Sequence, residues 1–266
     1  MPVAGSALDA ERPLLAQNKR MRHTRRILIG PAILLTVGGL IFLPCLFART
    51  DNEGWVRPAH SLQSIGWAMS NYQALHGTLP PAVVRHPDGR ALYSWRVLLL
   101  PLLGESKLFE QFHLDEPWDS PHNWPLSKET PRCYLPALGG YDDPPGLTRF
   151  QVFVGPGTAF ECGGLTWHDF PDGGSHTFLV VEASDAVVWS KPADLKYDPD
   201  TALPAMGGVF TKPVTLGCYT LWQKPGFVAC FADCSVHFIR ATTDDRIVRS
   251  LITGKGSEAI DLSQLD

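Results

Sequence analysis

Residues 27–47, ILIGPAILLTVGGLIFLPCLF, constrain this chain most strongly, because they form a run of 21 residues without a charge. A helix needs about 20 predominantly apolar residues to cross the hydrocarbon core of a bilayer. The run contains Pro31, Gly38, Gly39 and Pro44, which weaken helices in water but are tolerated in membrane-spanning helices. The segment therefore predicts a transmembrane helix rather than a buried helix of a soluble core.

The charges before this segment predict its orientation. Five positive residues crowd its N-terminal side: Lys19, Arg20, Arg22, Arg25 and Arg26. Positive residues near a span stay in the cytoplasm. We therefore expect residues 1–26 to form a cytoplasmic basic arm, residues 48–58 a linker and residues 59–266 one extracytoplasmic domain. This topology is that of a single-pass protein of the cytoplasmic (inner) membrane with its N-terminus inside.

A cleaved signal peptide is the alternative interpretation of the same segment. The apolar region of a signal peptide is usually about 7–15 residues long and ends in a small-x-small cleavage site. The run here is longer, and Leu46-Phe47-Ala48 matches such a site poorly. The sequence therefore favours an uncleaved signal-anchor.

The charge of the chain divides at the same place. Residues 1–26 carry six Lys or Arg and two Asp or Glu, a net charge of +4, and the remainder carries 17 against 25, a net charge of −8. An acidic domain without a basic run argues against nucleic acid as a partner. The basic arm instead predicts contact with anionic lipid of the cytoplasmic membrane.

The cysteines predict neither a metal site nor a complete set of disulfides. Beyond Cys45 in the apolar segment they are Cys133, Cys162, Cys218, Cys230 and Cys234. Because five is odd, at least one is free or paired between chains. Cys230-x-x-x-Cys234 with His237 lacks the fourth ligand of a typical zinc site. We therefore predict no metal and no cofactor.

The spacing of apolar residues predicts an α+β domain, with an amphipathic helix packed on an antiparallel sheet. Leu62, Ile65, Met69 and Tyr72 recur at intervals of three and four, which predicts a helix over about 59–75, ended by Gly77. The remaining expected elements are strands at 150–154, 177–182, 186–189, 227–231 and 235–239, and a helix after Thr243 as its N-cap. Residues 177–182 form the central strand, and residues 186–189 return beside it across a turn at Ser184-Asp185.

The hairpin formed by residues 227–239 carries an unusual turn residue. A three-residue loop, Ala232-Asp233-Cys234, commonly places its last residue in the left-handed region. A residue with a β-carbon costs about 1–2 kcal/mol there, so Cys234 is strained unless its sulfur forms a bridge. Cys230 would need an unusual geometry, which makes Cys218 the better candidate for a disulfide with Cys234.

No catalytic motif is found, and we predict a protein that is not an enzyme. Six residues are candidates for ligand binding: Trp118 and Trp124 in the proline-rich segment 117–146, Trp167, Asp172 and His176 before the central strand, and Glu182 at its end. Each has a structural alternative. The tryptophans could anchor the loop, Asp172 and His176 could stabilise a turn, and Glu182 could pair with an arginine.

Five segments together carry a more specific pattern. They are HSLQSIGWAMSNYQALHGTLPP at 60–81, SWRVLLLPLL at 94–103, DGGSHTFLVVEASDAVVWSKPADLKYDP at 172–199, GFVACFADCSVHFI at 226–239 and GKGSEAI at 254–260. In this order they resemble a mostly planctomycete family of pilin-like proteins of unknown function. Its members typically carry a prepilin-type cleavage and methylation segment, and its domain is also labelled solute-binding protein family ten.

The resemblance implies a membrane-anchored, extracytoplasmic protein similar to type II secretion pseudopilins, with no known enzyme activity. This chain departs from the family in lacking Gly-Phe-Thr-Leu-Ile-Glu before its apolar segment and any Glu within it. It is therefore expected to be a divergent member that keeps its N-terminus. Cys234 stands where the family usually has glycine, and His176 where it usually has asparagine.

Two functions remain open at this point. The first is a non-enzymatic structural or recognition component of the cell envelope, with the membrane, further copies or other envelope proteins as partners. The alternative is an extracytoplasmic binding module for a glycan or another polar ligand.

Overall fold

The computed structural model describes residues 56–135, 143–161, 166, 169–170, 172–207, 214–216, 219–221 and 225–253. All of them belong to the unit Gly54–Asp266. The predicted transmembrane segment and the basic arm lie outside the described residues. No helix of the described part is long and apolar enough to span a bilayer.

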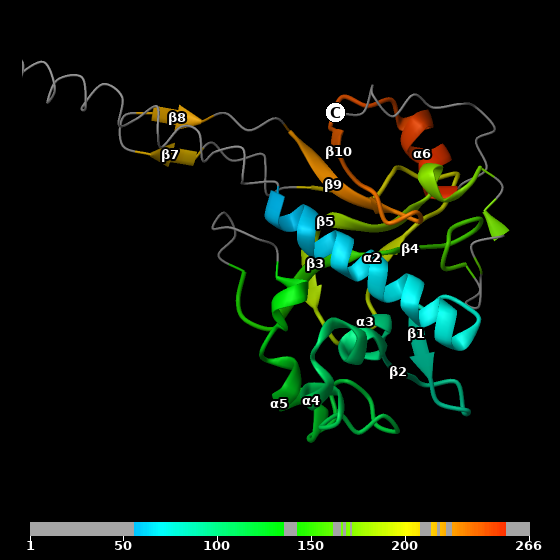
Figure 1. Cartoon of the computed structure of the whole chain (residues 1–266), viewed down its shortest axis with the longest axis vertical. Coiled ribbons are helices and arrows are strands. Elements are labelled where there is room, and N and C mark those ends of the chain that lie inside the picture. The colour runs from blue at the N-terminus through cyan, green and yellow to red at the C-terminus, as the bar shows by residue number, and fades with distance from the viewer. Residues whose placement is uncertain are drawn as a thin grey trace, which may run out of the picture. The chain divides into compact units, whose positions relative to one another are not determined.

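The described residues form a mixed α+β fold, as predicted (Figure 1). The α-helices are α2 (Val56–His76), α3 (Trp95–Leu99), α4 (Ser106–Phe109), α5 (Asn123–Ser127) and α6 (Asp245–Thr253). The 3-10 helices are η2 (Leu100–Leu103), η3 (Arg132–Tyr134) and η5 (Gly174–His176). The strands are β1 (Val83–Arg85), β2 (Ala91–Ser94), β3 (Leu147–Gln151), β4 (Phe153–Val154), β5 (Phe178–Val188), β6 (Leu195–Lys196), β7 (Val214–Leu216), β8 (Tyr219–Leu221), β9 (Gly226–Phe231) and β10 (Val236–Arg240).

The main sheet has four antiparallel strands in the order β10-β9-β5-β3. Helix α2 packs along one face of it and α6 along the other, so both faces are buried (Figure 1). Strand β9 shows this arrangement in its side chains. Val228 and Cys230 join the core beneath α2, whereas Phe227, Ala229 and Phe231 join the core beneath α6. A strand covered on both faces is expected to be apolar throughout, and every residue of β9 is buried.

The amphipathic helix is confirmed, with bounds slightly wider than predicted. Leu62, Ile65 and Met69 are fully buried in the core. Gly77 ends the helix with φ +83° and donates its N–H to the Gln73 carbonyl oxygen at 2.7 Å. Midway along α2, a β-carbon added to Gly66 would lie 2.6 Å from the Cys230 Sγ. The missing side chain therefore lets the helix approach β9 closely.

The predicted turn at Ser184-Asp185 is wrong, because β5 runs without interruption from Phe178 to Val188. In this extended conformation the backbone groups of Ser184 and Asp185 have hydrogen-bond partners. The Ser184 N–H donates to the Ala205 carbonyl, and the Asp185 carbonyl accepts from the Gln151 side-chain amide at 2.7 Å. Strand β3 pairs with both halves of β5, from Leu147 opposite Val188 to Gln151 opposite Val181. Pairing with a neighbouring strand thus outweighs the turn preference of Ser and Asp.

A buried arginine joins the first part of the domain to the sheet. Arg96 is fully buried, and its Nε and Nη2 both donate to the Phe150 carbonyl, at 2.9 and 2.7 Å. Its Nη2 also lies 2.7 Å from Asp194 Oδ1, and its Nη1 donates to Ser94 Oγ at 2.7 Å. The Asp194 side chain is itself only 3% exposed. Arg96 thus binds Phe150 and Asp194, which lie 54 and 98 positions away in the sequence, and this fixes the relative position of the three segments.

The remaining predictions on the C-terminal half have mixed outcomes. The hairpin of β9 and β10 is confirmed, with Cys230 opposite Val236. Helix α6 is confirmed, but its N-cap is Asp244, whose Oδ1 accepts from the Arg246 N–H at 2.8 Å, instead of Thr243. A carboxylate at this position also interacts favourably with the helix dipole.

The left-handed turn residue is confirmed. Cys234 has φ 66°, the sole positive φ of a non-glycine residue within the described ranges. The Cys234 N–H donates to the Phe231 carbonyl at 2.9 Å, and the Phe231 N–H donates to the Ser235 carbonyl at 2.8 Å. These two bonds close the three-residue loop and hold the cysteine in its strained conformation.

We predict that Cys234→Gly raises the free energy of unfolding by up to about 1 kcal/mol under reducing conditions, because glycine adopts this φ without steric cost. Chemical denaturation of the purified protein measures it. Cys234→Ser is the matched control, since it keeps the β-carbon and should show no such gain. Equal stability of the two variants would contradict the strain argument, and a loss confined to oxidising buffer would show that the sulfur is bridged.

Candidate functional site

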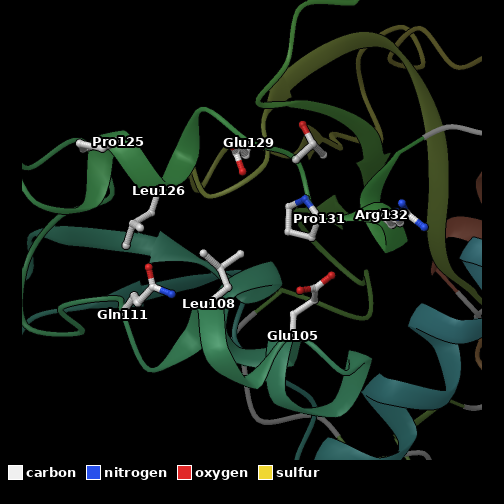
Figure 2. A pocket seen from close by; sticks show the side chains of 9 residues that line it. Glu105, Leu108, Gln111, Pro125, Leu126, Glu129, Pro131 and Arg132 are labelled. Carbon is white, nitrogen blue, oxygen red and sulfur yellow. The ribbon is translucent and has the colours of Figure 1, made fainter.

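A pocket of about 470 Å³ lies between α4, α5 and residues 129–132 (Figure 2). Its apolar lining is Leu108, Pro125, Leu126 and Pro131, and its polar lining is Glu105, Gln111, Glu129, Thr130 and Arg132. Figure 2 shows Leu108 and Leu126 pointing toward each other from opposite sides. Pockets of about 300–1,000 Å³ are typical of small-molecule sites. This pocket is therefore the candidate functional site of the described residues.

Backbone restrictions in the sequence shape this pocket. Gly104 adopts φ +82° after η2, which turns the chain so that the Glu105 N–H donates to the Leu100 carbonyl at 2.9 Å. Pro125 falls in the first turn of α5, where a missing N–H costs no helical hydrogen bond. Pro131 is buried and extended, with φ −54° and ψ 141°.

The loop beside the pocket is held by one buried amide, Asn123. Its Nδ2 donates to the carbonyls of His113, Glu116 and Pro117, at 2.9, 3.3 and 3.0 Å. Its Oδ1 accepts from the His113 N–H at 2.9 Å. Asn123 is fully buried, and its own N–H is bound by Ser120 Oγ at 3.0 Å. This residue therefore ties residues 113–117 to the start of α5.

A pair of histidines reinforces the same corner. The rings of His113 and His122 stack with centroids 3.4 Å apart and an angle of 4° between their planes. His122 Nε2 lies 2.8 Å from the carbonyl oxygen of Gln111, a residue of the pocket lining. His113 Nδ1 lies 3.0 Å from Glu116 Oε1. These contacts join the wall of the pocket to the loop that Asn123 holds.

The pocket carries an excess of negative charge. Glu105 and Glu129 line it against a single cation, Arg132, and across the described residues none of these three side chains forms an ion pair. Behind the lining, burial and then the charge of Glu105 raise the pKa of the Cys133 thiol to about 12. This thiol stays protonated at neutral pH and is a poor nucleophile.

Neither of the two described tryptophan candidates lines the pocket. Trp118 is half-buried against the core, and the Lys191 Nζ lies 5.7 Å from its ring centroid. Its backbone N–H donates to the Leu92 carbonyl at 2.7 Å. Trp124 is 40% exposed and meets Trp118 edge to face, with ring centroids 5.8 Å apart. Trp167 lies outside the described residues.

Asp172 and His176 lie on either side of a tight turn before β5. Gly173 has φ +80°, and Ser175 Oγ lies 3.0 Å from His176 Nδ1. Residue Gly174 of this turn accepts the Asp233 N–H, so the turn packs against the hairpin loop that holds Cys234. Among the described residues, no group of three or more His, Cys, Asp or Glu side chains is arranged so that it could hold a metal ion.

Glu182 is the most unusual of the predicted residues. It lies opposite Phe150 in the centre of the sheet and is fully buried. Within the described residues neither carboxylate oxygen has a hydrogen bond of normal geometry, although the Val228 N–H lies close enough to lower the pKa of the group. Burial raises the pKa of Glu182 to about 7, although the nearby Val228 amide and Arg149 lower it. Arg149 also forms an ion pair with Asp143, with its Nε 2.7 Å from Asp143 Oδ2.

The predicted disulfide between Cys218 and Cys234 is not tested by the described residues. Among these residues Cys133, Cys230 and Cys234 form no disulfide with one another. Cys218 lies outside them, so its bridge to Cys234 stays a prediction.

The sequence did not indicate the residues that form the pocket. Six of its nine lining residues come from the proline-rich segment 117–146, and the other three, Glu105, Leu108 and Gln111, come from residues 105–111. The available signal was turn chemistry, in the form of Gly104 and the prolines around Asn123. The carboxylates Glu105 and Glu129 are 24 positions apart and carry no motif.

Residues 60–141 match a family model described as a protein of unknown function (DUF1559, SBP_bac_10). This match supports the family label, and every residue that lines the pocket falls within it. No curated protein matches the chain, and no solved structure does.

We predict that Glu182→Gln stabilises the protein at pH values above about 7 and has little effect near pH 4. The folded pKa lies at about 7, above the ordinary value of 4.5. The folded state therefore holds the proton more tightly, and wild-type stability falls as the pH rises from about 4.5 to 7. The resulting loss of wild-type unfolding free energy between these pH values is on the order of 3 kcal/mol, since each pKa unit corresponds to about 1.36 kcal/mol.

Denaturation of both proteins across this pH range measures the difference. Glu110→Gln, at an exposed position, is the control and should leave the pH profile unchanged. A Glu182→Gln profile parallel to wild type would refute a raised pKa.

We predict that Asn123→Ala lowers the free energy of unfolding by about 1–3 kcal/mol, because it leaves buried backbone groups without partners. It should also expose residues 113–117 to limited proteolysis. Ser120→Ala removes only one bond to Asn123, at its N–H, and should cost less. Equal losses from the two variants would show that the amide does not hold the loop.

Proposed function

We propose that the chain is a non-enzymatic, single-pass membrane protein whose domain 59–266 works outside the cytoplasmic membrane as a pseudopilin-like structural or recognition component. Its partners are the membrane and either further copies of itself or other envelope proteins. The observation that carries the proposal is the packing of α2, which begins at Val56, along a four-stranded antiparallel sheet. A long helix on such a sheet, shortly after an apolar segment, is the arrangement expected of an anchored pseudopilin-like domain.

Three described side chains support a non-enzymatic function. Burial raises the pKa of Cys230 well above its usual value and that of Cys133 to about 12, so neither thiol is an activated nucleophile. The Glu182 carboxylate is sealed inside the sheet and has no access to a substrate. Catalysis by nucleophile and base needs such groups side by side and accessible.

The pocket favours a second candidate, a binding module. Its lining combines an apolar floor with polar groups, as ligand sites do. The two candidates are compatible, because recognition of a partner at the envelope requires a binding surface.

We predict that a reporter fused after Asp266 is active only as an exported protein, since the positive residues at 19–26 keep the N-terminus inside. The measurement is a pair of fusions, one to a reporter active only outside the cytoplasm and one to a reporter active only inside. The matched control replaces the five positive residues at 19–26 by Asn and should reduce export. Activity of the cytoplasmic reporter in the unaltered chain would overturn the proposed topology.

A further inference from the structure

The charges of the pocket lie around an aliphatic floor. Glu105 precedes α4 and Glu129 follows α5, and Figure 2 shows them on opposite sides of the pocket, with the side chain of Leu108 on α4 pointing into it. Glu105 is half-buried and Glu129 is exposed. Within the described residues neither carboxylate accepts a hydrogen bond or forms an ion pair, so both are available to a ligand.

The single cation of the pocket does not balance them. Arg132 lies at the margin in Figure 2, on the far side from Leu126 and Gln111. An anionic ligand would therefore meet two like charges against one opposite charge. Electrostatic complementarity favours a cation.

The composition of the lining also argues against a glycan. Sugar faces stack on aromatic rings, and none of the nine lining residues is aromatic. Trp118 and Trp124, the expected sugar shelf, pack against each other outside this lining. The apolar surface is instead aliphatic, formed by leucine and proline, which suits a methylene chain.

We propose that this pocket binds a primary ammonium group carried on an aliphatic chain, as in a lysine side chain or a free diamine. The methylenes lie against Leu108 and Leu126, and the ammonium lies between Glu105 and Glu129. This inference deepens the proposed recognition role and rests on it, because it names the chemistry that the domain recognises.

The test is titration calorimetry of the full chain in detergent with four probes. Cadaverine and acetyl-Ala-Lys-Ala-amide carry the ammonium, and they distinguish a free diamine from a polypeptide as its source. 1,5-Pentanediol has the same chain without charge, and glutarate has the opposite charge. We expect binding of at least one ammonium probe, weakened by salt, and no binding of pentanediol or glutarate.

Variants assign the binding to this pocket. Glu105→Gln and Glu129→Gln should each weaken it by about two- to fivefold, as expected for partly exposed ion pairs. Glu110→Gln is the control, at the exposed residue that follows α4 and does not line the pocket, and should leave binding unchanged. Arg132→Ala gives the sign of the ligand charge, because loss of the arginine tightens binding of a cation and weakens binding of an anion.

Several results would overturn the proposal. These are tighter binding of glutarate or pentanediol than of both ammonium probes, no binding of either ammonium probe, or ammonium binding that is insensitive to Glu105→Gln and Glu129→Gln. Circular dichroism and thermal melting of each variant show that lost binding is not lost folding. This binding test does not depend on the topology of the chain, which the reporter fusions measure in cells, so the two proposals can fail independently.

Discussion

The buried guanidinium of Arg96 is the interaction on which the arrangement of the domain depends. An ion pair out of water is tolerated only where further hydrogen bonds satisfy both partners, and removal of one partner typically costs about 3–5 kcal/mol. Arg96 meets Asp194, which also accepts from the Val152 N–H at 3.1 Å. Because its Nε and Nη2 bind the Phe150 carbonyl as well, strand β3, helix α3 and the segment before β6 cannot shift independently.

The pocket depends on the same interior through side chains rather than through regular structure. The Tyr134 hydroxyl donates to the Arg96 carbonyl at 2.8 Å and so fixes η3 at one end of the pocket. At the other end, Ser127 and Ser190 lie 2.6 Å apart, which joins α5 to the end of β5. Together with the hydrogen bonds of Asn123, these contacts give an irregular segment a defined shape without long helices or strands. Such preorganisation lowers the entropic cost of binding a ligand.

Local patterns predicted the helix and the hairpin because their causes lie within a few residues. The spacing of Leu62, Ile65 and Met69 and the loop before Ser235 are examples, and the conformation of Cys234 followed from the length of that loop. The continuous strand β5 was missed because its partners, such as Ala205, come from elsewhere in the chain. The pocket was missed because its lining comes from two separate segments, residues 105–111 and 125–132, and no local pattern in the sequence indicates that they meet.

The close approach of α2 to β9 at Gly66 makes the Cys230 thiol a built-in reporter of motion. Its sulfur lies directly under the helix backbone and is fully buried, so an alkylating reagent can reach it only when α2 separates from the sheet. The rate of its modification relative to that of the half-buried Cys234 therefore measures how often this helix opens. The domain carries its own probe of whether helix and sheet separate before the rest unfolds.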